Sequence, residues 1–167
     1  MEPKLRAQTE WGWKIAAYLF LAGVGAGAYA WAVVLDFVGR GDALARVGVM
    51  LGFPLLAVGT LFLIADLGVR QRALRAFMNP GTSWIARGTL IISGFMILAL
   101  LHAAAWVWPY EWLARWPEIR LALGGVNLAF AVLTMVYTGV LLGASRPIAM
   151  WSTALLPILF LISALST

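Results

Sequence analysis

The sequence contains no cysteine and a single histidine, His102. Without thiols, the chain forms no disulfide and holds no cysteine-ligated iron–sulfur cluster. A b-type haem in a membrane protein usually takes two axial histidines, so one histidine excludes a haem ligated by two histidines of this chain. We therefore expect neither haem nor metal in this chain.

Charged residues are also scarce, at 11% of the chain, whereas 63% of the residues are hydrophobic. A soluble domain of 167 residues cannot bury that much apolar surface, so the composition predicts an integral membrane protein. The net charge of +5 does not indicate nucleic acid, because the 12 Lys and Arg lie between apolar runs, where lipid headgroups and topology explain them. Most of the nine Trp lie near the ends of those runs, as in an interfacial aromatic belt.

Five uncharged runs are long enough to span a bilayer, which takes about 20 helical residues. They are Ile15–Leu35, Val47–Ala65, Gly88–Tyr110, Leu121–Ser145 and Pro147–Thr167. None shows the alternation of a barrel strand, so we predict an all-α membrane protein with one transmembrane domain over residues 1–167. We expect a four-helix bundle plus one further helix, over roughly residues 12–38, 43–69, 84–109, 121–144 and 147–167. The first run is too long for a typical signal peptide and is taken as the first transmembrane helix.

The connections differ in charge at the two ends of the predicted bundle. The end that holds the N-terminus, here called the N-terminal face, receives eight cations, and the opposite face receives four. The eight are Lys4, Arg6, Lys14, Arg70, Arg72, Arg75, Arg87 and Arg146, and the four are Arg40, Arg46, Arg115 and Arg120. The positive-inside rule then predicts a cytoplasmic N-terminus.

Polar side chains from separate helices converge at the N-terminal face. Because successive helices alternate in direction, Tyr18, Asp66, Arg87 and Tyr137 reach a similar depth. Ionisable groups inside a membrane are costly and often functional. Their convergence favours a pocket for a polar headgroup whose apolar tail lies between helices.

Each of these side chains also has a structural explanation. Asp66 can form an i,i+4 pair with Arg70, and the tyrosines can belong to the aromatic belt. Lys14 and Arg87 can extend to lipid phosphates. Ser83, which follows the turn Asn79-Pro80-Gly81-Thr82, can be a helix N-cap.

Two polar residues lie deeper or toward the opposite face. His102 is either a hydrogen-bonded structural histidine or part of a proton relay. Asn127 is expected to bridge helices. Close helix packing is indicated by small-xxx-small pairs, namely Gly23/Gly27, Gly48/Gly52 and Gly139/Gly143.

Several segments, in order and spacing, resemble the polysulfide-reductase-type (NrfD-like) membrane subunits. The resemblance rests on Trp11-Gly-Trp13 with Tyr18 to Gly23, Asp66-Leu-Gly68, Asn79 to Gly88, Tyr137 to Gly143, Arg146-Pro147, Trp151, and Leu156 to Phe160. It covers nearly the whole chain. It differs at the first helix, where the family often has Asn or His and this chain has Ile15 and Tyr18.

The resemblance implies a haem-free subunit that reacts with a quinone, menaquinone or ubiquinone, in a bacterial or archaeal cell membrane. An iron–sulfur subunit would dock on the N-terminal face, together with a molybdopterin- or tungstopterin-type catalytic subunit, so the chain alone would not be catalytic. Asp66 and Tyr137 would serve the proton chemistry, and Trp13, Tyr18, Arg87 and Tyr137 would bind the quinone. Arg87 would favour the ionised form of Asp66. The family usually has two four-helix bundles, so a second membrane half is expected elsewhere.

Two other functions fit the same residues. In a small transporter or proton-conducting subunit, Asp66 and His102 would mark an ion path, although paired broken helices are missing. In a passive anchor, the segment Arg70–Pro80 would only dock a soluble enzyme.

Overall fold

The computed structural model describes residues 12–39, 42–67, 84–107, 115–144 and 155–166. They form five helices and contain no strand, which confirms the all-α fold. The helices are α1 (Trp13–Phe37), α2 (Asp42–Leu67), α4 (Trp84–Ala104), α5 (Pro117–Ala144) and α6 (Leu156–Ser166). The first four are long and apolar enough to cross a membrane, and α6 is a shorter apolar helix.

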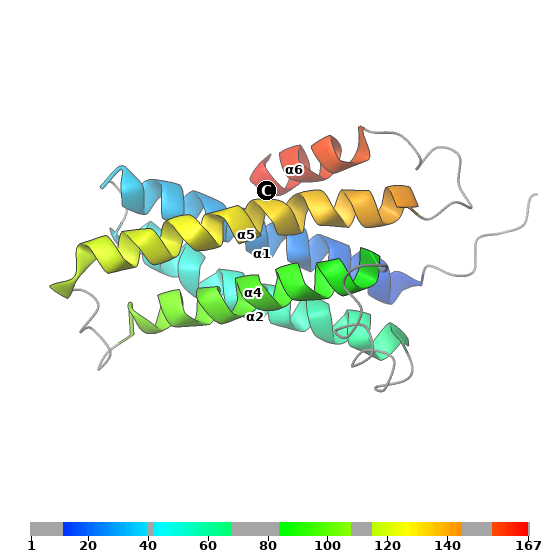
Figure 1. Ribbon diagram of the computed structural model, residues 1–167, viewed down its shortest axis with the longest axis horizontal. Coiled ribbons are helices and arrows are strands. Elements are labelled where there is room, and N and C mark those ends of the chain that lie inside the picture. Colours follow the sequence, from blue (N-terminus) through cyan, green and yellow to red (C-terminus); the bar gives the residue numbers. More distant parts are fainter. Residues whose placement is uncertain (1–11, 40–41, 68–83, 108–114, 145–154, 167) are drawn as a thin grey trace, which may run out of the picture.

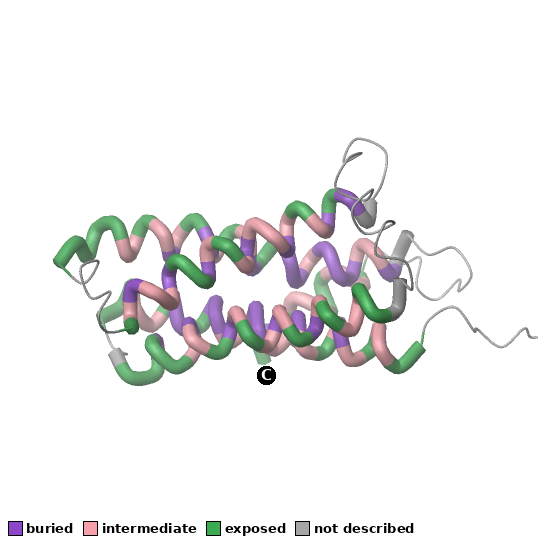
Figure 2. Tube along the Cα trace, turned by 90° about the horizontal axis from the view of Figure 1, so that it is seen from below, coloured by how far each residue is buried: buried purple, intermediate pink, exposed green. Residues whose placement is uncertain are grey.

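Helices α1, α2, α4 and α5 lie side by side as an antiparallel bundle, and α6 packs beside α5 and α1 (Figure 1). The N-terminal face is the right-hand end in Figure 1, where α1 and α4 begin and α2 and α5 end. Buried residues face the inside of the bundle, and exposed ones cover its outside (Figure 2). Large apolar side chains are among the most exposed, such as Phe20 at 66% and Leu44 at 68%. An apolar outside suits lipid, so the protein is a multi-pass membrane protein.

Helix α1 ends at a glycine with a left-handed backbone. Gly39 has φ +67°, a conformation that closes helices because glycine adopts it without steric cost. The N–H groups of Val38 and Gly39 donate to the carbonyl oxygens of Val34 and Asp36, both at 3.1 Å. The last turn therefore holds Asp36 at the opposite face.

Helix α5 begins with Pro117 and has Glu118 in its first turn, both favourable at a helix N-terminus. The backbone N–H of Arg120 donates to the carbonyl of Trp116 at 3.2 Å. Arg120 therefore belongs to α5, although the sequence had suggested a connection there. Its charge is tolerated inside the helix because it pairs with Asp36, as described below.

The closest helix contact is between α1 and α2. A Cβ atom added at Gly48 would lie 2.7 Å from the Cβ of Ala32, and one added at Gly52 would lie 2.9 Å from the Cβ of Tyr29. These distances are shorter than ordinary carbon contacts, so the two glycines let the backbones approach. The packing role predicted for Gly48/Gly52 is confirmed.

Helix α6 docks on α1 through backbone contacts. A Cβ atom at Gly27 would overlap the backbone carbonyl of Ala164, and the indole N–H of Trp31 donates to the carbonyl oxygen of Leu165 at 2.8 Å. Several predicted features lie outside the described residues. They are Trp11, the Arg70–Pro80 segment, Ser83, Arg146-Pro147 and the start of the fifth span.

Candidate functional site: two buried tyrosines at the N-terminal face

Tyr18 lies inside the bundle one turn from the start of α1 and has 0% exposure. It packs over Gly59 of α2, because a Cβ atom there would lie 3.3 Å from the carbonyl oxygen of Tyr18 and 3.6 Å from its Cδ2. The buried phenolic oxygen of Tyr18 has no hydrogen-bond partner within the described residues. Most buried hydroxyl groups are hydrogen-bonded, so this oxygen is an exception that needs an explanation.

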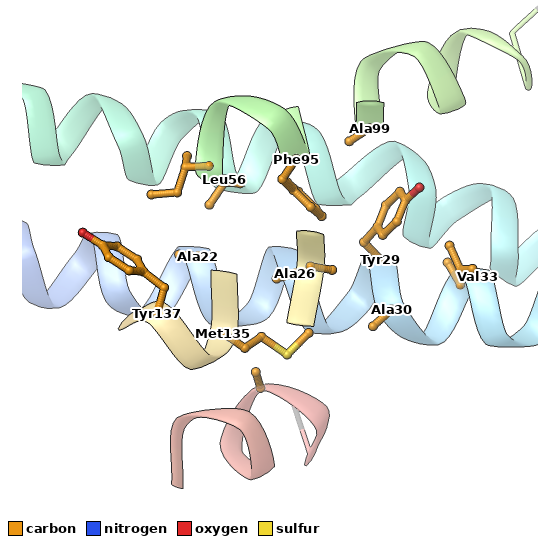
Figure 3. Packing of buried hydrophobic residues seen from close by; sticks show 14 of the residues in the cluster. Ala22, Ala26, Tyr29, Ala30, Val33, Leu56, Phe95, Ala99, Met135 and Tyr137 are labelled. Carbon is orange, nitrogen blue, oxygen red and sulfur yellow. The ribbon is translucent and has the colours of Figure 1, made fainter. Parts of the chain in front are cut away.

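Tyr137 reaches the same end of the bundle from α5 and is 6% exposed. Its ring occupies the space beside Gly88 of α4, where an added Cβ atom would overlap the ring carbons and the phenolic oxygen. Figure 3 shows its hydroxyl directed toward the N-terminal face. The phenols of Tyr18 and Tyr137 are both buried at this end of the bundle and interact electrostatically. The structure therefore brings these two predicted residues together inside the protein.

Asp66 lies in the last turn of α2, and its side chain lies outside the described part of the chain. It follows Gly59, the residue beneath Tyr18, by about two helical turns, which places both on the same face of α2. The backbone of Asp66 is therefore about 10 Å farther along α2 toward the N-terminal face than that of Gly59.

Trp13 and Arg87 lie at the same end of the bundle but on its outside. Trp13 is 69% exposed, and its ring meets that of Phe62 edge to face at 5.6 Å between centroids. Arg87 precedes the buried Gly88 and is itself exposed. The structure thus separates the predicted site residues into a buried pair, Tyr18 and Tyr137, and two residues on the surface around it.

An apolar layer lies beneath the two tyrosines. Figure 3 shows the buried side chains between Tyr137 and Tyr29, which are Ala22, Ala26, Leu56, Phe95 and Met135. The hydroxyl groups of Thr134 and Thr138 donate to carbonyl oxygens of their own helix, at 2.8 and 2.6 Å. The tyrosine pair is therefore closed off from the opposite half of the bundle.

A second polar cluster lies on the other side of that layer, and its ion pair was not predicted from the sequence. Arg120 of α5 forms an ion pair with Asp36 of α1, at 2.9 Å between Nη2 and Oδ1. The Arg120 guanidinium also lies 4.7 Å from the centroid of the Trp106 ring, a cation–π distance. The side chain of Asp36 is only 5% exposed, so the ion pair lies within the bundle.

The cluster continues inward through Tyr29, His102 and Asn127. The Tyr29 hydroxyl and His102 Nδ1 lie 2.6 Å apart, so His102 is hydrogen-bonded, as both of its predicted roles allow. With its carboxamide in the orientation that satisfies hydrogen bonding, Asn127 accepts from Tyr29 and from the Ala99 N–H, both at 3.1 Å, and donates to the carbonyl of Phe95 at 3.3 Å. It therefore joins α5 to α4 and α1, and its predicted bridging role is confirmed.

The hydrogen-bond donors of the tyrosine pair and of the second polar cluster are better suited to bind oxygen atoms of an organic ligand than to bind a metal ion. Across the described ranges, no group of three His, Asp or Glu side chains could hold a metal. The tyrosine pair offers two hydroxyl groups, each of which can donate or accept a hydrogen bond.

The full sequence matches a family of known proteins. The family model described as "Polysulphide reductase, NrfD" matches residues 1–167. The chain belongs to this NrfD family, which confirms the resemblance found in the sequence. No solved structure matches it.

Two curated NrfD-family relatives are similar over most of this sequence. It is 28% identical to Protein NrfD of Escherichia coli strain K12, over 94% of this chain and 56% of that protein. It is also 28% identical to the C subunit of the polysulfide reductase of Wolinella succinogenes, over 93% of this chain and 55% of that protein. The chain thus spans about half the length of these relatives.

Proposed function

We propose that this chain is the quinone- or quinol-reactive membrane subunit of a multi-subunit oxidoreductase. It would exchange electrons with an iron–sulfur subunit docked on the N-terminal face. Membership of the NrfD family and the similarity to a polysulfide reductase subunit support this assignment. The observation that carries it is the buried, unpartnered hydroxyl of Tyr18 beside Tyr137.

The residues of this pocket fit a quinone headgroup. A buried hydroxyl without a partner costs about 1–3 kcal/mol, and a carbonyl or hydroxyl oxygen of the ligand would offset that cost. Tyr18 would hold one such oxygen, and Tyr137, fixed by Gly88, would orient the ring. A bound quinone supplies two-electron, two-proton redox chemistry.

Asp66 would exchange the proton at its carboxylate, since it lies on the Tyr18-facing side of α2 near the membrane surface. A carboxylate at that depth can pass protons to and from water. Trp13 and Arg87, exposed around the pair, would flank the entrance and face lipid headgroups. The apolar layer below would keep water out of the rest of the bundle.

The proposed complex has further members. A molybdopterin- or tungstopterin-type subunit would carry the substrate chemistry, and a second membrane half would complete the membrane part. We place the complex in a bacterial or archaeal cell membrane with the N-terminus of this chain in the cytoplasm. The eight cations of the N-terminal face support that orientation.

Asp66→Asn and Tyr137→Phe are expected to reduce quinone-dependent turnover of the intact complex by about 10²-fold, the usual cost of losing a proton-transfer group. Tyr18→Phe is expected to cost about tenfold, the equivalent of one hydrogen bond to the ligand. The measurement compares quinone turnover with the activity of the same complex toward an artificial electron carrier, which bypasses the membrane subunit.

Thr134→Val is the matched control, because it removes a buried hydroxyl one turn from Tyr137 that donates only to its own helix. It should retain quinone turnover. Full turnover in both Asp66→Asn and Tyr137→Phe would refute the proposed site. Absence of any quinone dependence would indicate a passive anchor, and ion flux in proteoliposomes without a redox partner would indicate a transporter.

A further inference from the structure

Three buried nitrogen atoms lie together at the opposite face. They are His102 Nε2, Trp106 Nε1 and Arg120 Nε, and none has a hydrogen-bond partner within the part of the chain that is described. Arg120 links the three residues, because its guanidinium lies 4.7 Å from the centroid of the Trp106 ring and interacts electrostatically with His102. His102 lies in the last turn of α4, and Trp106 lies two residues beyond its end, in a turn where the Trp106 N–H donates to the carbonyl of Ala103 at 3.0 Å.

Gly124 provides the space beside His102. It lies one turn after Arg120 on α5, and a Cβ atom there would lie 3.1 Å from His102 Cε1 and 3.7 Å from Nε2. A side chain at this position would therefore press against the imidazole ring beside Nε2.

A small neutral molecule would be a suitable hydrogen-bond partner for the three nitrogen atoms. A buried polar group without a partner costs free energy comparable to a lost hydrogen bond. The nitrogen atoms of Trp106 and Arg120 can only donate, and Asp36 already neutralises the Arg120 charge. A water molecule satisfies all three, because it accepts two hydrogen bonds and donates a third.

The tautomer of His102 follows from its neighbours. Asn127 accepts the single hydroxyl proton of Tyr29 at 3.1 Å. With the hydroxyl proton directed to Asn127, Tyr29 accepts from His102, and the proton of the neutral ring lies on Nδ1, 2.6 Å from the Tyr29 oxygen. The Nε2 atom is left with a lone pair that can accept a hydrogen bond.

We propose that a buried water molecule bridges Trp106, Arg120 and His102, and that His102 Nε2 is a proton-binding site reached from the opposite face. In the loading step, a hydronium ion at that face donates a proton through this water. A new N–H bond forms at Nε2 as an O–H bond breaks, and no electron is transferred. Nδ1–H keeps its hydrogen bond to Tyr29 throughout.

Among the described residues, the charged and titratable groups considered around His102 come from α1, α2 and α5. Helix α1 supplies Tyr29 and Asp36, and α5 supplies Arg120, which interacts with the imidazole electrostatically. On α2, the charged Arg46 is exposed. Asp36 stabilises the positive charge of a protonated ring, and Arg120 opposes it. Arg120 is 22% exposed, which connects the cluster to the membrane surface.

This proton site is separate from the tyrosine pair. The apolar layer of Ala22, Ala26, Leu56, Phe95 and Met135 lies between Tyr137 and Tyr29 (Figure 3). The inference therefore does not rest on quinone chemistry and can be tested without it.

Solid-state ¹⁵N NMR of the full chain in lipid bilayers tests the site directly, because the chain has 1 His and histidine labelling reports on His102 alone. At alkaline pH we expect a proton on Nδ1, none on Nε2, and magnetisation transfer from water to Nε2. Acidification should protonate Nε2. A proton on Nε2 at alkaline pH, or no transfer from water, would overturn the proposal.

Gly124→Ala should abolish the transfer from water, because the added methyl group fills the space beside Nε2. Gly125→Ala is the matched control on the next residue. Its Cβ atom would meet only the Phe37 ring at 3.4 Å and should leave the His102 signals unchanged. Equal signals in both variants would contradict the proposed position of the water. If Gly124→Ala does not fold, the wild-type spectrum alone still tests the proposed proton site.

Discussion

Replacing Gly88 with alanine is expected to lower quinone-dependent turnover by about 10²-fold, the cost of a displacement near 1 Å at a reacting group. The new methyl group would occupy the same space as the Tyr137 ring and hydroxyl. Tyr137 is buried among side chains of other helices, so it cannot move aside without disturbing them. Overpacking of this kind also costs about 1–3 kcal/mol of stability.

The assay is quinone turnover of the assembled complex, measured alongside its thermal unfolding. Gly125→Ala is the control, since it adds the same methyl group to a transmembrane helix with an ordinary 3.4 Å contact to Phe37. We expect Gly125→Ala to keep both turnover and stability. If Gly88→Ala behaved in the same way as this control, the position of Tyr137 would not matter for the reaction.

Replacing Arg120 with methionine is expected to destabilise the protein by about 3–5 kcal/mol, because it removes the guanidinium that pairs with a buried carboxylate at 2.9 Å. Asp36 is 5% exposed and receives a 2.9 Å hydrogen bond from Arg120. The same substitution also removes the cation from the Trp106 ring. The free energy of unfolding in detergent micelles or bilayers gives the measurement.

A double-mutant cycle separates charge from packing. Asp36→Leu combined with Arg120→Met removes both charges and should recover most of the lost stability, as in other buried ion pairs replaced by apolar groups. Arg46→Gln is the matched control, since Arg46 is exposed on α2 and should change stability by at most about 0.5 kcal/mol. A loss for the double variant as large as that for Arg120→Met would show that packing, not charge, accounts for the effect.

Much of the fold could be predicted from the sequence because lipid imposes simple rules. Uncharged runs of sufficient length predicted the helices, and short connections between them predicted an antiparallel bundle. The glycine spacing in α2 predicted a close helix contact, and the structure identifies α1 as the partner. The convergence of Tyr18 and Tyr137 followed from alternating helix direction alone, which sets the depth of each residue.

The opposite half of the bundle could not be predicted in the same way. The Asp36–Arg120 pair joins residues 84 apart, and Tyr29 and His102 are 73 apart. The sequence predicts the depth of each residue in the membrane. Which residues at the same depth are in contact depends on the rotation of each helix about its own axis, which the sequence does not give. Asp36 and Arg120 looked like residues of the connections because each lies at the edge of an apolar run. One usable signal was the spacing Tyr18, Ala22, Ala26, Tyr29, Val33, which marks the buried stripe of α1.

The same ambiguity applied to Trp13 and Arg87. Their depth agrees with that of the tyrosines, yet both side chains lie outside the bundle. An interfacial tryptophan and an interfacial arginine are favoured by the bilayer whatever the protein does. Sequence position alone therefore could not separate residues of the pocket from residues that anchor the bundle in the membrane.

The apolar layer between Tyr137 and Tyr29 acts as electrical insulation. An electrical potential drops mainly across the region with the lowest dielectric constant. Most of a transmembrane voltage would therefore drop over the few helical turns around Ala22, Ala26 and Met135. Moving one elementary charge through 100 mV takes about 2.3 kcal/mol. The two polar ends of the bundle would thus lie at different electrical potentials.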